Sequence, residues 1–419
     1  MFDFHIAKGR IGHTFTAFKF KNFRLIWIGN LTSNIGSWMQ NVAQPWLVLS
    51  LSQSAFLLGL DAFAQDAPLL AFLLVGGALA DRKSRRTIIA ISQTVQLVTA
   101  LCLALLIYTG QAHVWIVILF SFIVGTVQAF SIPAYQALIT NLVDRPYLSN
   151  AIALNSMQFN LSRIIGPVIA GAVMSTLGLT WCFSLNALSF VAMLYAMWKL
   201  NLVPIKKPHA KSNSLAAILG GVKEITQSRQ MLGILLVVAA TGLFCGPLIT
   251  FIPIFAKDVY QTGARGFSQW LAMFGFGALT GALFLASDIF FKQSWKSVVG
   301  FGVLLAATVS LIGIVPSFGL SFPLLFLAGF AYLGCNASAQ SILQSSVSDE
   351  FRGRTASIYV LALRGGVPLG NLVTGLTVSH FGIRSAIFAN GTLSIFTLLW
   401  IANFWLKEKI AVSQALPTS

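Results

Sequence analysis

Four ionisable side chains lie inside long apolar stretches of this sequence, and they are its strongest candidates for chemistry. Asp61 and Asp66 share one such stretch, whereas Arg163 and Arg364 fall in two others. A charge at the centre of a bilayer costs on the order of 3 kcal/mol, so residues of this kind usually serve a function. At ~1.5 Å per helical residue, Asp66 and Arg163 would lie roughly 16–18 Å from the start of their helices, near mid-depth.

The two acids and the two bases suit different tasks. A carboxyl that loses its charge when desolvated and regains it beside an arginine can carry a proton, and we expect this of Asp66 and Asp61. Because the two acids are about 140° apart around a helix, one is expected at a helix interface and the other in a hydrated space. Arg163 and Arg364 are forked cations that suit a carboxylate or catecholate. The alternatives are a helix-packing role for each arginine and, for Asp66, a structural ion pair with one of them.

The elements that must position these residues are membrane-spanning helices. Of the 419 residues, 56% are hydrophobic and 9% charged, whereas about a quarter are charged in a typical soluble protein. Apolar runs of about 20 residues recur along the chain and predict an all-α membrane protein with twelve transmembrane helices. The expected spans are 24–49, 55–80, 87–109, 114–138, 150–176, 180–199, 230–255, 268–290, 296–315, 321–345, 355–379 and 383–406.

Lysine and arginine residues predict how these helices are oriented. Most of the 27 basic residues lie in alternate connections, and the opposite side has only Lys257, Arg265 and Arg384. The positive-inside rule therefore predicts that both termini are cytoplasmic. We expect the first span to be retained, since the basic stretch before it leads into it without a cleavage site of small residues.

The two halves of the chain resemble one another. Arg163 and Arg364 each precede a proline by four residues, in the fifth and eleventh expected spans. Such matched landmarks indicate duplication, and two like-oriented, pseudo-symmetric six-helix halves predict a transporter with its substrate site near the bilayer midplane. The expected division is a cytoplasmic segment 1–23, a six-helix half 24–199, a central cytoplasmic loop 200–229, a second six-helix half 230–406 and a cytoplasmic tail 407–419.

A cluster of small and charged residues follows the second expected span, with the sequence Gly77-Ala-Leu-Ala-Asp81-Arg-Lys-Ser-Arg85-Arg86. It resembles the signature of the major facilitator superfamily (MFS). Stretches such as Asn150-Ala-Ile-Ala-Leu-Asn155 and Arg163-Ile-Ile-Gly-Pro167 resemble a branch of proton-linked exporters that includes the enterobactin exporter and macrolide efflux proteins. The resemblance implies alternating access, export and coupling to the proton gradient.

The same resemblance implies a conformational gate on the cytoplasmic side. Asp81 and Arg85 would hold the cytoplasmic side closed in the outward-open state. The alternative is that the arginines serve only as a topology anchor. The gate residues would be Gly77, Asp81, Arg82, Arg85 and Arg86.

Uncharged polar and aromatic residues complete the candidate binding set. Each polar side chain can hydrogen-bond a ligand or a neighbouring helix, and Trp38 can stack on an aromatic ligand. The candidate substrate-binding residues are Arg163, Arg364, Asn34, Trp38, Gln128, Asn336 and Gln340, with Gln40 and Tyr135 in the same polar seam.

Other classes of function find no support in the sequence. It has no phosphate loop of the form Gly-x-x-x-x-Gly-Lys-Ser/Thr, and its five histidines are scattered, so we expect no cofactor, no metal site and no enzyme. The glycines in 275–281 indicate close helix packing instead of a phosphate loop. The net charge of +16 is spread between spans, which excludes nucleic acid as the expected partner.

The sequence therefore predicts a monomeric secondary transporter of the inner membrane that exports a small amphipathic molecule in exchange for protons. A siderophore is the favoured substrate, and it predicts a polar site that uses Arg163 or Arg364. Broad drug or macrolide efflux is the alternative, and it predicts an apolar site in which Asp61 or Asp66 attracts cations. A membrane sensor or an intramembrane enzyme is a remote alternative.

Overall fold

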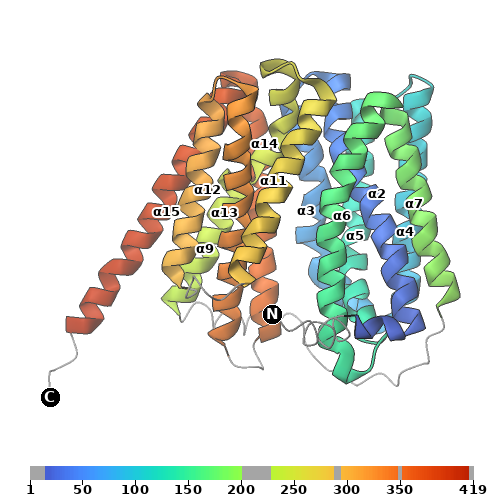
Figure 1. The fold of residues 1–419 in the computed structure, drawn as a ribbon, viewed down its shortest axis with the longest axis horizontal. Helices are drawn as coiled ribbons and strands as arrows, with labels where there is room; N and C mark the ends of the chain where they lie inside the picture. Colours follow the sequence, from blue (N-terminus) through green and yellow to red (C-terminus); the bar gives the residue numbers. More distant parts are fainter. Residues whose placement is uncertain (1–14, 201–227, 287–293, 348–351, 415–419) are drawn as a thin grey trace, which may run out of the picture. The chain divides into compact units, whose positions relative to one another are not determined.

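The computed structural model describes residues 15–200, 228–286, 294–347 and 352–414, and the regular elements in these ranges are helices (Figure 1). The first part of the chain forms two short helices and six long ones. They are η1 (Thr16–Lys19), α2 (Lys21–Ser52), α3 (Ala55–Arg82), α4 (Arg85–Tyr108), α5 (Val114–Ile139), η2 (Arg145–Tyr147), α6 (Leu148–Thr176) and α7 (Leu179–Lys199).

The second part begins after the central loop, most of which lies outside the described residues. Its elements are α9 (Arg229–Phe244), α10 (Pro247–Ile254), η3 (Phe255–Val259), α11 (Gly263–Ala286), α12 (Trp295–Ile314), α13 (Phe318–Ser345), α14 (Arg352–Phe381) and α15 (Ile383–Gln414). Helix α15 extends beyond residue 406, the expected end of the last span.

Nine stretches of helix within the described ranges are long and apolar enough to span a membrane. Three further helices have sufficient length but are less apolar: α2, α6 and α14. These three carry Trp38, Arg163 and Arg364, three of the candidate binding residues. A helix that is partly polar can lie at membrane depth only where its polar side chains are shielded from lipid, so each of these three helices is expected to turn its polar side chains away from lipid.

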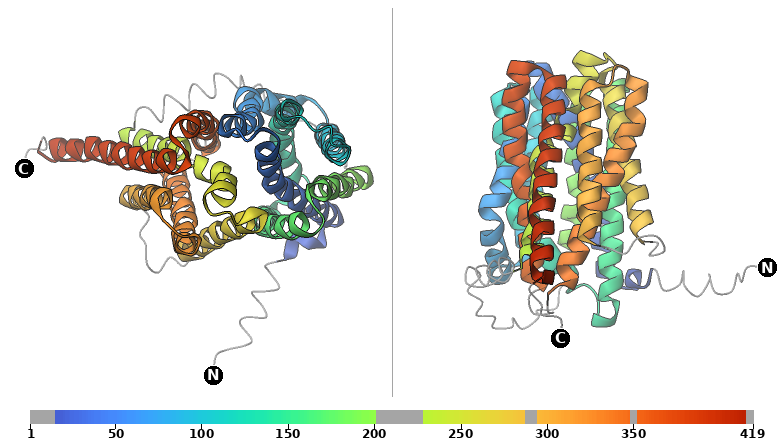
Figure 2. Two further views of the ribbon diagram at one scale, coloured as in Figure 1. Left: turned by 90° about the horizontal axis from the view of Figure 1, so that it is seen from above. Right: turned by 90° about the vertical axis from the view of Figure 1, so that its left-hand side faces the viewer.

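Contacts divide the chain into two compact units. Unit 1 comprises Met1–Leu47 and Ala67–His209, and unit 2 comprises Val48–Asp66 and Ala210–Ser419. In unit 1, α4 packs against α5 and α7; in unit 2, α11 packs against α13, α12 against α13 and α15, and α9 against α14. Within each unit the helices run lengthwise beside one another (Figure 2).

The helices begin and end at residues suited to those positions. Ser84 and Ser317 precede α4 and α13, and their side chains accept hydrogen bonds from backbone N–H groups in the first turn, as N-cap residues do. The α14–α15 connection is a single residue, Gly382, at φ +79°. Glycine adopts this left-handed conformation without steric cost, so two long helices can meet there in a tight corner.

The glycine-rich run in α11 is confirmed as a close-packing surface. A Cβ atom at Gly281 would lie 2.8 Å from the carbonyl oxygen of Phe330 in α13, and one at Gly277 would collide with the carbonyl of Phe326. In α13, Gly329 faces the backbone of Phe274 in the same way. The two helices approach so closely because each lacks side chains at the crossing.

The seventh expected span, 230–255, is interrupted in the structure. Helix α9 ends at Phe244 and α10 begins at Pro247. The cause is local, because proline has no N–H to donate to the carbonyl of Leu243 four residues before it. The N–H of Gly246 turns back to the carbonyl of Thr241, which completes the break.

Candidate functional site

The structure places Asp66 opposite Arg364 within unit 2. The first half of α3 runs antiparallel to α14, and both helices use glycine at the contact. A Cβ atom at Gly375 would lie 2.9 Å from the carbonyl oxygen of Ala55, and one at Gly59 would collide with the carbonyl of Asn371. This register, continued along both helices, brings Asp66 level with Arg364, and the positive charge of Arg364 acts on the Asp66 carboxyl.

Asp66 and Arg364 lie at depth in the helices and are not sealed from solvent. Asp66 is partly buried and the side chain of Arg364 is exposed. Arg364 is roughly 18 Å along α14 from its first residue. An arginine exposed at that depth is tolerable only in a hydrated environment, so we expect water to reach this pair of charges.

Asp61, the second predicted proton carrier, has different surroundings. Its side chain is only 3% exposed, whereas Asp66 one and a half turns further along α3 is partly buried. The two carboxyls thus differ in access to water, and proton exchange at Asp61 would need a larger rearrangement of its neighbours.

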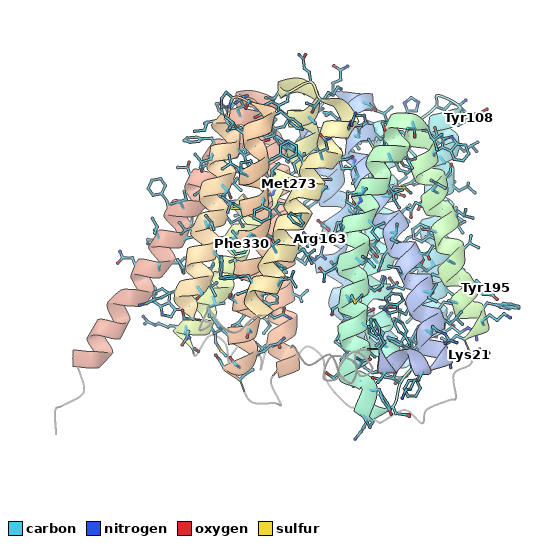
Figure 3. The ribbon with its side chains drawn as sticks, viewed as in Figure 1. Lys21, Tyr108, Arg163, Tyr195, Met273 and Phe330 are labelled. Carbon is cyan, nitrogen blue, oxygen red and sulfur yellow. The ribbon has the colours of Figure 1, made fainter. Side chains whose placement is uncertain are left out.

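The second predicted arginine, Arg163, lies in unit 1 about halfway along α6 (Figure 3). Its guanidinium carbon is 5.7 Å from the centre of the Trp38 ring, within the range of a cation–π interaction. Phe159, one turn before Arg163, meets the same ring edge-on at 5.9 Å. The structure therefore brings together two residues that were predicted separately from the sequence, Arg163 and Trp38, and adds Phe159, which no sequence pattern singled out.

Two of the uncharged candidates, Gln128 and Asn336, are hydrogen-bonded to other protein groups, and two others, Asn34 and Gln340, are at least partly exposed. Gln128 donates to the Gln96 side chain of α4 at 3.1 Å. Asn336 donates to the carbonyl of Tyr332 in its own helix, and its backbone carbonyl accepts from the hydroxyl of Tyr359 in α14. Asn34 is partly exposed and Gln340 is exposed, so these two have the freer access to a ligand.

Unit 1 contains a polar network that sequence reasoning largely missed. The amide of Asn186 in α7 donates to Gln40, Gln40 donates to Gln44, and Gln44 donates to Ser121 in α5. The network joins three helices through buried amides, which favour specific neighbours in a membrane. Its signal in the sequence is the spacing of Gln40 and Gln44, four residues apart and so on one helix face.

Two of the predicted gate residues bind the ends of neighbouring helices. Arg85 donates to the carbonyl of Ala137 near the end of α5 at 2.6 Å. Arg86 donates to the carbonyls of Trp198 and Leu200 at the end of α7, at 3.0 and 3.2 Å. A cation at a helix C-terminus is favourable because the last carbonyls lack partners. Gly77, Asp81 and Arg82 lie in the last turns of α3, and their side-chain surroundings are outside what the structure describes.

Replacing Arg86 by Met is expected to lower the stability of the protein by about 1–3 kcal/mol, because two carbonyls at the end of α7 lose a charged donor. The measurement is the thermal midpoint of the purified protein in detergent. Lys83→Met is the matched control, since it removes one positive charge from the exposed connection just before α4 and no hydrogen bond to α7. Equal midpoints for both variants would contradict the capping role.

Among the described residues, no three His, Cys, Asp or Glu side chains gather closely enough to hold a metal ion. The functional groups that the structure presents are thus amides, aromatic rings and the charged residues of α3, α6 and α14.

The sequence matches the MFS_3 family, described as transmembrane secretion effectors, over residues 12–416. The chain belongs to this family. It is 25% identical to the staphyloferrin A transporter of Staphylococcus aureus, covering 90% of this chain and 96% of that protein. It is 25% identical to the multidrug efflux pump Tap of Mycolicibacterium fortuitum, and this match covers 87% of this chain and 91% of Tap. The enterobactin exporter EntS of Shigella flexneri is 23% identical, covering 90% and 89%.

The fold is that of MFS transporters. A bacterial homologue of the human lysosomal transporter Spinster, solved in an inward-facing and unoccupied conformation, superposes with a TM-score of 0.72. The two chains are 18% identical, and the match covers 92% of this chain and 97% of that one.

The family confirms several predictions made from the sequence. The resemblance to siderophore exporters and macrolide efflux proteins is confirmed. The protein is a transporter and not an enzyme, and it is a multi-pass protein of the inner membrane. As a member of this family it exports small molecules. The residues described above are the basis for proposing which molecule it exports and which ion drives the export.

Proposed function

We propose that this MFS exporter moves a siderophore from the cytoplasm across the inner membrane in exchange for protons. In this proposal the chain has twelve spans, has both termini in the cytoplasm, acts as a monomer and works by alternating access. Two relatives named for siderophores, the staphyloferrin A transporter and the enterobactin exporter, support the substrate class.

The observation that carries the proposed coupling is the placement of Asp66 opposite Arg364. A charged Asp66 attracts Arg364 and favours the close contact between α3 and α14. A proton on Asp66 removes the attraction, and water can then solvate Arg364 instead. Protonation and the contact between these two helices are thereby linked, which is the requirement for an ion to drive a conformational change.

The remaining site residues take proposed roles in the same scheme. Asp61 is a second proton-binding candidate. Arg163 with Trp38 and Arg364 with Gln340 would contact substrate from α2, α6, α13 and α14, joined by Asn34, Gln128 and Asn336. Gly77, Asp81, Arg82, Arg85 and Arg86 are the proposed cytoplasmic gate, in which the described contacts of Arg85 and Arg86 lie on helix ends of unit 1.

Mass spectrometry of iron-starved cultures tests the proposed substrate. A strain lacking this protein is expected to retain an iron-chelating metabolite in the cell and to release less of it than the parent strain. Expression of the intact protein from a plasmid should restore release. Equal release by the parent and the deletion strain would contradict siderophore export.

Drug efflux is the second candidate, and the surface of α6 favours it. Phe159 is 42% exposed on the helix face that also carries the partly buried Arg163, so this face of α6 presents an apolar aromatic ring that ligands of varied structure can contact. The multidrug efflux pump Tap is a relative. If this candidate is right, the deletion strain becomes more sensitive to macrolides and accumulates fluorescent dyes, whereas its siderophore release does not change.

A further inference from the structure

Helices α2 and α7 of unit 1 pack against each other through glycine, and this contact fixes which residues lie at the same level. A Cβ atom at Gly29 would lie 3.0 Å from the Cβ of Ala196, and one at Gly36 would collide with the side chain of Ser189. A step of seven residues forward along α2 is thus matched by seven residues back along α7, so the two helices are antiparallel. The start of α2 therefore lies beside the end of α7.

Basic side chains gather where these two helix ends meet. Continued to the start of α2, the register places Arg24 at about the level of Lys199, the last residue of α7. Lys21 lies one turn before Arg24 on the same face of α2, and all three side chains are exposed. At about 3.6 residues per turn, the exposed residues of α2 and of α7 fall on the same side of the contact. Arg86 of α4 adds a further positive charge, and its hydrogen bonds to carbonyls at the end of α7 hold that end in place.

The three helices that carry these charges have no acidic residue to balance them. Neither Asp nor Glu is found in the sequences of α2, α4 and α7. Like charges at one level repel each other across the contact between α2 and α7, and an anion placed among them replaces this repulsion by attraction. The adjoining helix ends therefore favour an anionic ligand.

An apolar stripe leads away from these charges along α7. Its residues are between 46% and 70% exposed and follow one another at intervals of three or four residues, which places them on one helix face: Leu188, Val191, Tyr195 and Trp198. The Lys199 Nζ atom lies 5.7 Å from the centre of the Tyr195 ring and 5.6 Å from that of Trp198. Figure 3 shows Tyr195 pointing outward from unit 1. A ligand that binds Lys199 can thus extend an apolar chain along this stripe, which a free phosphate ion cannot do.

We propose that the adjoining ends of α2 and α7 form a binding site for an anionic phospholipid. Its phosphodiester would lie among Lys21, Arg24 and Lys199, and an acyl chain would follow the stripe of α7 past Trp198 and Tyr195. Basic residues beside aromatic rings at the membrane interface suit such a headgroup. A zwitterionic phospholipid is disfavoured, because its ammonium group would meet the same cations. The inference goes beyond the proposed export function and does not depend on the exported molecule.

The thermal midpoint of the purified protein in detergent micelles, titrated with dioleoylphosphatidylglycerol, tests the site. We expect a saturable rise in the midpoint, since a ligand that binds the folded state stabilises it. Dioleoylphosphatidylcholine has the same acyl chains without net charge, and inorganic phosphate has the charge without the chains. Each is expected to reach half of that rise only at a concentration about tenfold higher or more.

A double variant assigns the effect to the charges at the helix ends. Arg24→Gln with Lys199→Gln is expected to raise the half-saturating concentration of phosphatidylglycerol about tenfold or more, with each rise measured from the variant's own lipid-free midpoint. Arg145→Gln with Lys296→Gln is the matched control. It removes the same net charge from two exposed positions, before α6 and in the first turn of α12, and should titrate as the unaltered protein does.

A second pair of variants tests the aromatic part of the site. Trp198→Leu should raise the half-saturating concentration about two- to tenfold. Trp115→Leu removes a ring of similar exposure, 63% against 70%, at the start of α5 and should have no effect. Equal shifts by these two variants would remove Trp198 from the site and contradict the proposed path of the acyl chain.

Three other results would overturn the site: equal titrations by the two phospholipids, an equal effect of inorganic phosphate, or an unchanged titration of Arg24→Gln with Lys199→Gln. An equal loss of response in both double variants would show that net charge alone attracts the lipid, which would overturn a defined site as well. The titration involves no transport, so none of these outcomes bears on the proposed export function.

Discussion

Asp66→Asn is expected to abolish proton-driven export and to leave the protein folded in the membrane. Asparagine has nearly the shape of aspartate but cannot bind and release a proton. The variant should behave as the permanently uncharged form, in which Arg364 has lost its attraction to α3. Export into inverted membrane vesicles driven by an imposed proton gradient should then fall to the level of vesicles without the protein.

The same vesicles can separate a coupling role from a structural one. Exchange of labelled for unlabelled substrate at equal concentrations on both sides requires no net proton movement, so Asp66→Asn should retain it. The substrate is the metabolite identified from the culture supernatants. Asp144→Asn is the matched control, because Asp144 is an exposed acid in the connection before α6, and it should export at the normal rate.

A double variant addresses the alternative that Asp66 and Arg364 form only a structural ion pair. Removal of one member of an ion pair leaves the other charge without its partner, whereas removal of both is often tolerated. If the pair is merely structural, Asp66→Asn with Arg364→Gln should recover gradient-driven export. If Asp66 carries the proton, the double variant should not recover gradient-driven export, even at a substrate concentration high enough to saturate a site weakened by the loss of Arg364. Gradient-driven export by Asp66→Asn alone at the normal rate would exclude Asp66 as the proton carrier.

The position of the charges along their helices could be predicted from the sequence, but their partners could not. Counting residues placed Asp66 and Arg163 near mid-depth, and the structure has both well inside long helices. A count of residues cannot show which face of α3 meets which face of α14. That register depends on Gly59 and Gly375, whose small size matters only once the two helices are in contact.

The internal repeat predicted equivalent positions for Arg163 and Arg364 and left their roles open. Both arginines are followed by a glycine at a close helix contact: Gly166 meets α2, and Gly366 meets α9. The surroundings then diverge, because Arg163 lies over an aromatic ring and Arg364 faces a carboxylate. A close backbone contact near each arginine thus goes with different chemistry around the two side chains.

The break between α9 and α10 could have been predicted from the sequence, but the packing of α14 against it could not. Gly246 and Pro247 stand in the sequence as signals that end a helix. A run of apolar residues on both sides nevertheless predicts a continuous span, because hydropathy does not register a missing N–H. The structure shows that α14 lies against this break, with Gly370 next to the carbonyl of Leu243 that has lost its helical donor.

Gly370→Ala is expected to destabilise the protein by about 1–3 kcal/mol or more, as added methyl groups do in a packed core. Its Cβ atom would collide with the carbonyl oxygen of Leu243 and lie 2.9 Å from the carbonyl carbon and 3.1 Å from the ring of Pro247. Backbone atoms in a helix cannot turn aside as a side chain can, so α9 and α14 must separate. The thermal midpoint in detergent should fall, together with gradient-driven export.

Gly365→Ala on the same helix is the matched control and should have the opposite sign. No atom lies within 4 Å of a Cβ built at Gly365, and alanine stabilises a helix relative to glycine by about 0.5–1 kcal/mol. The two variants make the same chemical change five residues apart, so helix propensity cancels in their comparison. A midpoint for Gly370→Ala at or above that of Gly365→Ala would mean that α14 does not rest on the α9 break in the folded protein. A lower midpoint with export unaffected would show that the contact supports the fold and that transport does not depend on it.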